Sequence, residues 1–361
     1  MNYKILLISI LPAFLLLPAN AQSNSETRSY IRSFAVSRET TLEIINKYGA
    51  VQITSWKKDS AYIRAEIKAY SPNAEKLPAL FDGINVEIAG AGDAIKAQTT
   101  FTQNITRLFE GFKGMTGKFI SYESRVEINY YVSIPEYLNL RIDNKYGDLY
   151  MEDCMGTFSG SVSNGSFRAA SLKGESSVSL SFCDATIGSI SKGRIEASFS
   201  EIEAEHLGNI TINSTSSRYE VANAGEIRFE SRRDKIFIDT IAAVLGNSYF
   251  TDFAIKHLNR EISLESRYGK MEIELIDNEF EAINLNTGYT DLKLYFEQNS
   301  SYKLDIRHIN TFVTLPTQNA RTEEKMLDED KKEYMIYGTV GNSPGNARVK
   351  IDATRGQIYL K

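Results

Sequence analysis

The side chains able to coordinate a metal are few and widely spaced. His206, His257 and His308 are the only histidines, at equal intervals along the chain. A metal site requires its ligands to share one ion at about 2.1 Å. If these residues lie three rows of a stacked sheet apart, at about 4.8 Å a row, about 14 Å separates them. We therefore expect surface histidines and no metal-binding residues.

Thiol chemistry has two candidates, Cys154 and Cys183, which are the only cysteines. An oxidising compartment would permit a disulfide between them. Their spacing, however, does not match the sequence repeat described below, so the two cysteines fall at different positions within it. Two buried free thiols are the alternative, and the sequence leaves both open.

Paired carboxylates could perform acid–base chemistry on a glycan. Glu201 and Glu203 fall on one face of a strand, as do Glu272 and Glu274; carboxyl groups about 5 to 9 Å apart are used in glycoside cleavage. Glutamates at alternate positions also keep an exposed sheet soluble. The sequence lacks a nucleophile elbow, a zinc-binding helix motif, a Cys-x-x-Cys pair and a calcium loop. We therefore predict no catalytic residues and no cofactor.

Tyrosines are the more informative candidates for contact with a partner. Several fall at corners or alternate positions of the strand pattern, and a Tyr ring offers a broad contact area at low entropic cost. Such rings could contact sugars or a partner protein. Alternatively, they stack on one another and only stabilise the fold. The candidate surface contacts are Tyr146, Tyr150, Tyr219, Tyr268 and Tyr289.

Composition limits the class of protein that carries these residues. The 361-residue chain has 41 Lys and Arg against 46 Asp and Glu, a formal charge of −5. That balance excludes a basic nucleic-acid binder. Only 7 residues are proline, while 20 are tyrosine and 18 phenylalanine. Few prolines and many aromatic residues favour extensive β-ladders, because proline removes a ladder donor.

The first 21 residues match a secretory signal peptide. Lys4 precedes an apolar run from Ile5 to Leu17, and small residues lead to a predicted cleavage site between Ala21 and Gln22. The apolar run is shorter than the about 20 residues of a membrane span. We therefore expect an exported chain, in the periplasm, on the outer surface or outside the cell, with no membrane span after cleavage.

An internal repeat dominates the rest of the chain. Two short alternating apolar stretches flank a small polar corner, as in residues 140–151, 262–273 and 349–360. Corners recur at nearly even intervals from Gly147 to Thr290, with a period of about 18. Each copy is too short to bury its own apolar face. Stacked copies bury these faces together, which is typical of a solenoid.

Two arrangements of these strands compete. Corners such as Asn164-Gly165 would also serve as hairpin turns in an antiparallel meander or sandwich. A nearly constant two-strand period over many copies favours stacked turns of chain. We therefore predict an all-β, single-chain, β-helix-like solenoid of about 18-residue two-strand repeats, preceded by a small α+β unit.

Two segments depart from the period. Residues 22–135 are expected to form the N-terminal β-rich unit, with a short helix near 72–83, and residues 136–361 the repeat domain. Within the latter, residues 321–333 carry a dense run of charges, which predicts a solvated loop or helix inserted before the last repeat. The strand Ile358 to Leu360 is expected to be an exposed sheet edge.

The chain resembles the bacterial putative-adhesin family, a β-strand-repeat domain of unknown function akin to the head domains of auto-transporter adhesins. The resemblance spans residues 34–361. Its motifs are Asn46 to Gly49, Asn144 to Gly147, Val132 to Pro135 and Thr354 to Ile358. It implies a β-solenoid in an envelope or secreted protein with an adhesive role. It transfers no catalytic residue to this chain.

Three functions are consistent with these features of the sequence. The first is a non-enzymatic binding or adhesion module of the cell envelope, whose partner is a glycan or an envelope protein. The second is a glycan-active β-helix enzyme, a lyase or a hydrolase, which needs converging carboxylates in a groove. The third is a purely structural envelope protein linked to stress signalling.

Overall fold

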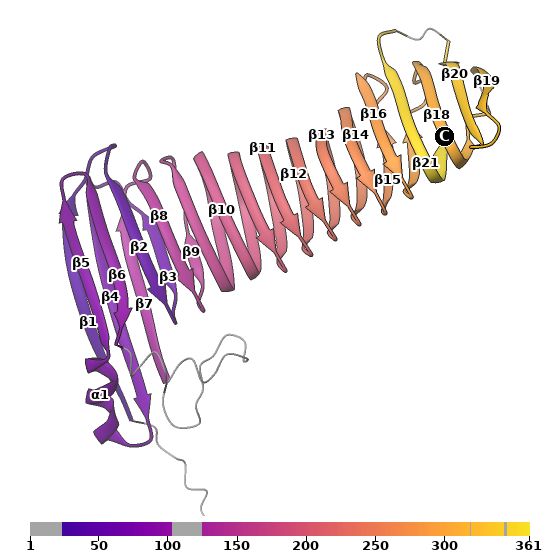
Figure 1. Ribbon diagram of the computed structural model, residues 1–361. Helices are drawn as coiled ribbons and strands as arrows, with labels where there is room; N and C mark the ends of the chain where they lie inside the picture. Colours follow the sequence, from indigo (N-terminus) through magenta and orange to yellow (C-terminus); the bar gives the residue numbers. More distant parts are fainter. Residues whose placement is uncertain (1–23, 103–124, 318, 343–344) are drawn as a thin grey trace, which may run out of the picture.

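The computed structural model describes residues 24–102, 125–317, 319–342 and 345–361. These residues form 21 β-strands that hydrogen-bond into one continuous sheet, with one short α-helix. Figure 1 shows the strands following one another as an elongated stack, from the N-terminal strands at one end to the C-terminal strands at the other. The predicted all-β fold is confirmed.

The strands of the first half range in length from 3 residues in β9 to 41 in β10. They are β1 (Asn24–Ala35), β2 (Thr41–Lys47), β3 (Val51–Ser55), β4 (Ser60–Ser71), β5 (Ile84–Ala91), β6 (Ala94–Phe101), β7 (Arg125–Ile134), β8 (Asn139–Lys145), β9 (Leu149–Met151) and β10 (Phe158–Ser198). A 3-10 turn (Ala74–Lys76) and helix α1 (Leu77–Asp82) lie between β4 and β5.

The strands of the second half begin with long members of the stack and end in a hairpin and a return strand. They are β11 (Glu201–Thr215), β12 (Arg218–Arg232), β13 (Lys235–Tyr249), β14 (Asp252–Arg267), β15 (Lys270–Ile276), β16 (Ala282–Gly288), β17 (Asp291–Phe296), β18 (Tyr302–Thr314), β19 (Ala320–Asp328), β20 (Glu333–Val340) and β21 (Arg348–Leu360).

Parallel pairing at a constant offset builds the middle of the stack. Glu201 of β11 pairs with Arg218 of β12, which pairs with Lys235 of β13, so each step along the stack has the same length in sequence. The offset is one residue longer where β10 pairs with β8 and where β14 pairs with β15. These offsets agree with the predicted period and exclude an antiparallel meander for this region.

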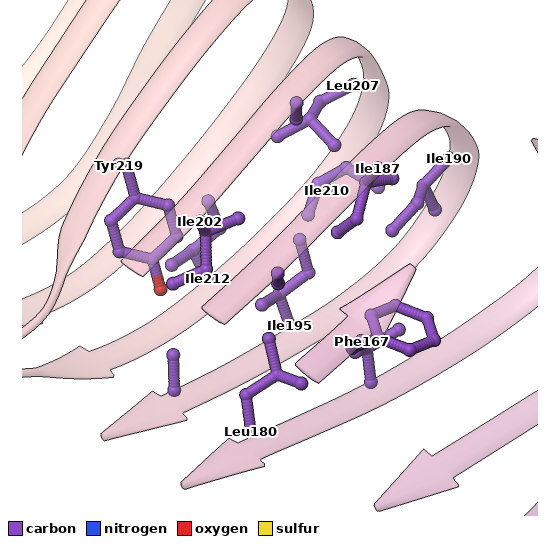
Figure 2. Close-up of a cluster of buried hydrophobic side chains, with 14 of the residues drawn as sticks. Phe167, Leu180, Ile187, Ile190, Ile195, Ile202, Leu207, Ile210, Ile212 and Tyr219 are labelled. Carbon is purple, nitrogen blue, oxygen red and sulfur yellow. The ribbon is translucent and has the colours of Figure 1, made fainter. Parts of the chain in front are cut away.

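Alternation within each repeat separates a buried face from an exposed one. Ile202, Leu207, Ile210 and Ile212 are at most 3% exposed, whereas Glu203, Glu205 and Asn209 between them are exposed. Figure 2 shows these side chains pointing into the space enclosed by the bending chain, where they meet the same positions of neighbouring repeats. Each such burial stabilises the fold by about 1.5–3 kcal/mol, and only a neighbouring repeat can supply it.

One residue with positive φ marks the corner of each repeat. Phe182, Phe199, Ser216, Arg233 and Phe250 have φ between 51° and 59°, and they follow one another at the interval of the strand pairing. This left-handed conformation is unusual for residues other than glycine, and costs about 1–2 kcal/mol. The corner residues therefore form a column along one edge of the stack.

The N-terminal strands continue the stack. β2 pairs in parallel with β8, and β3 pairs in parallel with β9, so residues 41–55 add a further row. Beyond that row, β1 and β4 pair antiparallel, as do β5 and β6. The helix predicted near residues 72–83 is present, and Pro78 is its second residue, where its missing N–H breaks no helical hydrogen bond.

The C-terminal end differs from the prediction in two respects. β21 lies between β16 and β18, with Ile351 opposite both Leu285 and Ile306, and Ile358 likewise pairs with Leu292 and Val313. The expectation that Ile358 to Leu360 form a free edge is therefore wrong. No periodic signal marks this return, because β21 pairs with β16 across several intervening strands of sequence.

The charged run at 321–333 is also not a loop or helix. It forms β19, the turn after it and the start of β20, an antiparallel hairpin added to β18. β19 pairs with β20 alone among the described strands, so it is the edge of the sheet. Charged side chains are common on edge strands because they oppose unwanted pairing, and this explains a strand with so polar a sequence.

Candidate binding surface

Exposed aromatic rings stack on one another along the corner column. The rings of Phe182 and Phe199 have centroids 4.9 Å apart and planes 6° apart. Further along, Tyr268 stacks on Phe250 at 4.9 Å and on Tyr289 at 5.0 Å. We call these five residues the corner ladder. All five are more than 40% exposed.

Stacking in the corner ladder opposes the strain of its backbone. Each aromatic pair contributes about 0.5–1.5 kcal/mol beyond simple burial, similar in size to the left-handed conformation that each corner requires. Stacking also covers ring faces, which are what a sugar ring would contact. The rings of Phe250 and Tyr289 stack on either side of Tyr268. Tyr268 therefore stabilises the fold, and only the edge of its ring is open to a partner.

Four of the five predicted contact tyrosines divide into three groups. Tyr268 and Tyr289 are exposed and stacked together at the corner. Tyr146 is a corner residue near the N-terminal end, half-buried and stacked on Tyr48 at 5.6 Å. Tyr150 is half-buried elsewhere, and its hydroxyl donates to Asp148 Oδ2 at 2.9 Å. The structure therefore brings together only Tyr268 and Tyr289.

Tyr219 is not a surface residue, which corrects its prediction as a contact. It is fully buried, and burial raises the pKa of its hydroxyl. In the parallel register it stands between Ile202 and Ile236, both interior residues. Figure 2 shows the ring beside Ile202 and Ile212, inside the stack. Tyr219 points inwards because it is aligned with these interior residues. Its aromatic character does not determine where its side chain points.

A groove runs across the exposed face of the sheet next to the corner ladder. Its volume is about 850 Å³. It crosses six successive rows of the sheet, a length of about 24 Å at the usual strand spacing. Each row contributes two or three lining residues. Those on the outer face include Glu196, Ser198, Asn213, Thr215, Glu230, Arg232, Asn247, Tyr249, Glu265 and Arg267.

Acidic and amide side chains alternate along the groove floor. Glu196 pairs in register with Asn213, and this alternation continues through Glu230 and Asn247 to Glu265. Asn247 Nδ2 donates to Glu230 Oε1 at 3.0 Å. The floor therefore presents a regular series of hydrogen-bond donors and acceptors across the strands.

Tyr249 and two arginines form the side of the groove nearest the corner. In register, Tyr249 stands between Arg232 and Arg267. Its ring lies nearly perpendicular to that of Phe250, with centroids 4.6 Å apart and planes 82° apart. Arg267 forms an ion pair with Glu265 at 3.0 Å. This side of the groove thus combines an aromatic ring with guanidinium donors.

The histidines do not gather at a site, and one of them corrects the prediction. His206 is exposed and His257 is half-buried. His308 is buried beneath the β19–β20 hairpin, where its ring stacks on Tyr334 and its Nε2 lies 3.8 Å from Glu324. Burial lowers the pKa of His308. Within the described ranges, no group of His, Cys, Asp and Glu could hold a metal ion.

Both cysteines are free and buried, as the second of the two alternatives proposed. Cys183 Sγ donates to the backbone oxygen of Val162 at 3.2 Å. Burial raises the pKa of the Cys154 thiol to about 11 and also raises that of Cys183. Neither thiol is therefore activated as a nucleophile.

Two of the four glutamates proposed for acid–base chemistry are engaged in surface ion pairs. Glu201 lies 3.4 Å from Arg218, and Glu272 lies 3.4 Å from Lys293. Both pairs project from the sheet away from the groove, since none of these four residues lines it.

Two other predictions concern the ends of the chain and the membrane. The proposed cleavage site, Ala21 and Gln22, lies outside the described residues. The described part of the chain contains no helix with the length and apolar character that a membrane crossing requires.

Three rings of the corner ladder were not among the predicted contacts. Phe182, Phe199 and Phe250 belong to the same corner column as Tyr268, and their spacing follows the repeat. Aligning the copies on the corner would therefore have found them. Arg232, which borders the groove, carries no such signal, because the two preceding repeats place Ser198 and Thr215 at its position.

Comparison with known proteins provides little information about this surface. No protein-family profile matches the chain, and neither does any curated protein. Among solved structures, the chain is similar to the crystal structure of a "putative cell adhesion protein" from Clostridium sporogenes. The match covers 93% of this chain and 99% of the other, at 10% identity and a TM-score of 0.17. A TM-score this low does not establish a shared fold.

Proposed function

We propose that the chain is an exported β-solenoid that acts as a non-enzymatic binding or adhesion module of the bacterial cell envelope. The regular parallel register of the strands supports the solenoid, and the signal-peptide pattern of residues 1–21 supports export. The adhesive role follows the family that the sequence resembles. Its partner in this proposal is an extended polymer, and a glycan is the favoured class.

The observation that carries the proposal is the groove beside the corner ladder. It is open along the sheet surface and polar, and it repeats one pattern of Glu and Asn from row to row. Side chains repeated at the strand spacing suit a ligand that itself repeats, because each unit meets the same donors and acceptors. Many weak contacts then sum to a useful affinity.

A non-enzymatic role is consistent with the same groove. Its glutamates stand in line along the floor, and Glu196 and Glu265 each lie within 3.5 Å of an arginine on their own strand. Glycoside cleavage needs two carboxyl groups facing each other across a bond, one of them with a raised pKa. The floor offers a line of acceptors in place of such a facing pair.

Two aromatic residues at separate places on the surface provide a matched test. Tyr249 lines the groove, whereas Phe237 lines a different surface pocket and is similarly exposed. A glycan array probed with the exported chain should lose signal with Tyr249→Ala and keep it with Phe237→Ala. Unfolding in urea of both variants and the wild type shows that each is folded. An array and a cell-adhesion assay that are both blank for the wild-type chain would refute the proposal.

A further inference from the structure

Unpaired positive charges gather at one point of the stack. Between residues 170 and 296, all of them described, nine lysines and arginines lie within 4.0 Å of a carboxylate. The four others are Arg228, Arg232, Arg233 and Lys235, each exposed and without a carboxylate partner among the described residues. All four fall within one short segment of sequence, so the grouping is local and not a general property of the sheet.

One of these cations, Arg232, lines the groove, and Arg228 and Arg233 lie close to it on the same repeat. Arg228 and Arg232 share the exposed face of β12 with Glu230, a groove residue that lies between them in sequence. Arg233 is the next residue after Arg232 and forms the corner. Lys235 begins β13 on the other side of that corner. The guanidinium groups therefore border the groove near its middle.

The corner ladder is interrupted at the same place. Ser216 and Arg233 occupy the corner between Phe199 and Phe250, so these two rings stand three rows apart, about 14 Å. Phe199 stacks on Phe182 and Phe250 on Tyr268, which leaves one face of each ring turned towards the interruption. Of the unpaired cations, Arg233 thus lies between these two rings in the corner column.

We propose that Arg228, Arg232 and Arg233 bind the acidic groups of an extended anionic polysaccharide that lies in the groove. This inference rests on the proposed function and names the class of its ligand. Guanidinium groups form paired, charge-assisted hydrogen bonds with carboxylate, sulfate and phosphate. Because none of these three arginines pairs with a carboxylate of the described chain, binding breaks no ion pair there.

The remaining groove residues distinguish a polysaccharide from a nucleic acid. Glu196, Glu230 and Glu265 line the same groove, and the chain carries a net charge of −5. A phosphate at every unit of a nucleic acid would be repelled by these carboxylates. A polysaccharide also carries hydroxyl groups beside its acidic groups, and these donate hydrogen bonds to the carboxylates and amides of the groove.

The neighbouring repeat supplies the variant that tests this. Thr215 and Ser216 hold the positions equivalent to Arg232 and Arg233, so Arg232→Thr with Arg233→Ser copies a sequence that this fold already accepts. Lys192→Ser with Lys256→Ser removes two charges that are ion-paired and lie outside the groove. Unfolding midpoints of both variants, compared with the wild type, establish that each is folded.

The probes are immobilised polygalacturonate, dextran sulfate and teichoic acid, with methyl-esterified polygalacturonate and plain dextran as their uncharged counterparts. We expect binding to at least one acidic polymer, reduced by salt, and weakened at least about tenfold in the arginine variant but not in the lysine variant.

Several results would overturn the inference. Equal binding to charged and uncharged polymers would do so while leaving the proposed binding function intact. Equal affinity of the arginine variant and the wild type would exclude these residues. Binding to none of the three acidic polymers, or tighter arginine-dependent binding to duplex DNA, would refute the ligand class. A blank glycan array and adhesion assay would instead remove the proposed function itself.

Discussion

The ring of Tyr268 stacks on the ring of Tyr289 with centroids 5.0 Å apart, and both residues hold a left-handed backbone, with φ of 57° and 53°. Such a backbone costs about 1–2 kcal/mol in a residue other than glycine. The cost recurs at each corner because every repeat must bend there. Stacking between neighbouring corners offsets part of it, so the corner ladder is first a structural device.

The corner ladder predicts an unusual order of stability. Tyr268→Ala removes the stacking on Phe250 and Tyr289 but keeps a left-handed residue, so we expect a loss of about 1–3 kcal/mol. Tyr268→Gly removes the same stacking and also relieves the backbone strain. Glycine should therefore be the more stable variant by about 0.5–1 kcal/mol. Urea unfolding of both variants measures this difference, and a less stable glycine variant would contradict it.

The return of β21 predicts how the C-terminal end responds to a core mutation. Ile351 is fully buried between Leu285 and Ile306, and Ile351→Ala should cost about 2–5 kcal/mol. Because β21 is the described strand that joins β18 to the stack, amide exchange should accelerate in residues 302–340 more than in 201–232. Lys350→Ala, on the exposed face, is the control. Uniform acceleration along the chain would argue against β21 as the link.

A buried carboxylate predicts a pH dependence of stability. Asp234 is 2% exposed and accepts hydrogen bonds from the backbone N–H of Ser217 at 2.7 Å and from the Ser231 hydroxyl at 2.6 Å. Burial raises the pKa of this carboxyl above its ordinary value of 3.8. The folded state then holds a proton that the unfolded state has lost, so this group's contribution to stability falls as pH rises above 3.8.

Asp234→Ser isolates that contribution. Serine stands at the same corner position in the two preceding repeats, where Ser200 and Ser217 accept the equivalent backbone bond. The free energy of unfolding of the wild type, relative to this variant, should decrease as pH rises from about 4 and then level off. Unfolding in urea across that range gives the two curves. Parallel curves would show that Asp234 does not titrate as described.

The buried thiols predict an inert chemistry. With the pKa of Cys154 raised to about 11 and both side chains buried, Ellman's reagent should label neither cysteine in the folded chain at neutral pH. Both should react after unfolding in guanidinium. Protein recovered from an oxidising compartment should also show two reactive thiols after unfolding. The loss of both would indicate a disulfide between Cys154 and Cys183.

The repeat is predictable from the sequence because a short alternation inside a longer, regular period leaves a clear trace. Single aromatic residues are misassigned where the direction of a side chain depends on register. Tyr219 and Tyr268 look alike in sequence, yet Tyr219 is aligned with Ile202 and Ile236 and is buried. Alternation alone does not fix which residue occupies the left-handed corner, so the two could not be separated.

Contacts at the end of the stack are harder still to predict. His308 is buried where the β19–β20 hairpin pairs with β18, and the first strand of that hairpin is rich in charges and lacks an apolar alternation. β21 joins two strands that both lie far before it in the sequence. Neither arrangement repeats, so no internal comparison of copies reveals it. The free arginines of the groove are likewise visible only once the partners of the other cations are known.

Binding of an extended polymer across the strands of the groove is tested most directly by calorimetry. The exported chain is titrated with length series of oligogalacturonides and, in parallel, of cello-oligosaccharides. In the series that binds, affinity should increase with chain length and level off once the oligosaccharide spans the groove, about 24 Å. A single sugar that binds as tightly as the longest oligosaccharide, or affinity that is independent of length, would contradict a groove that holds an extended polymer.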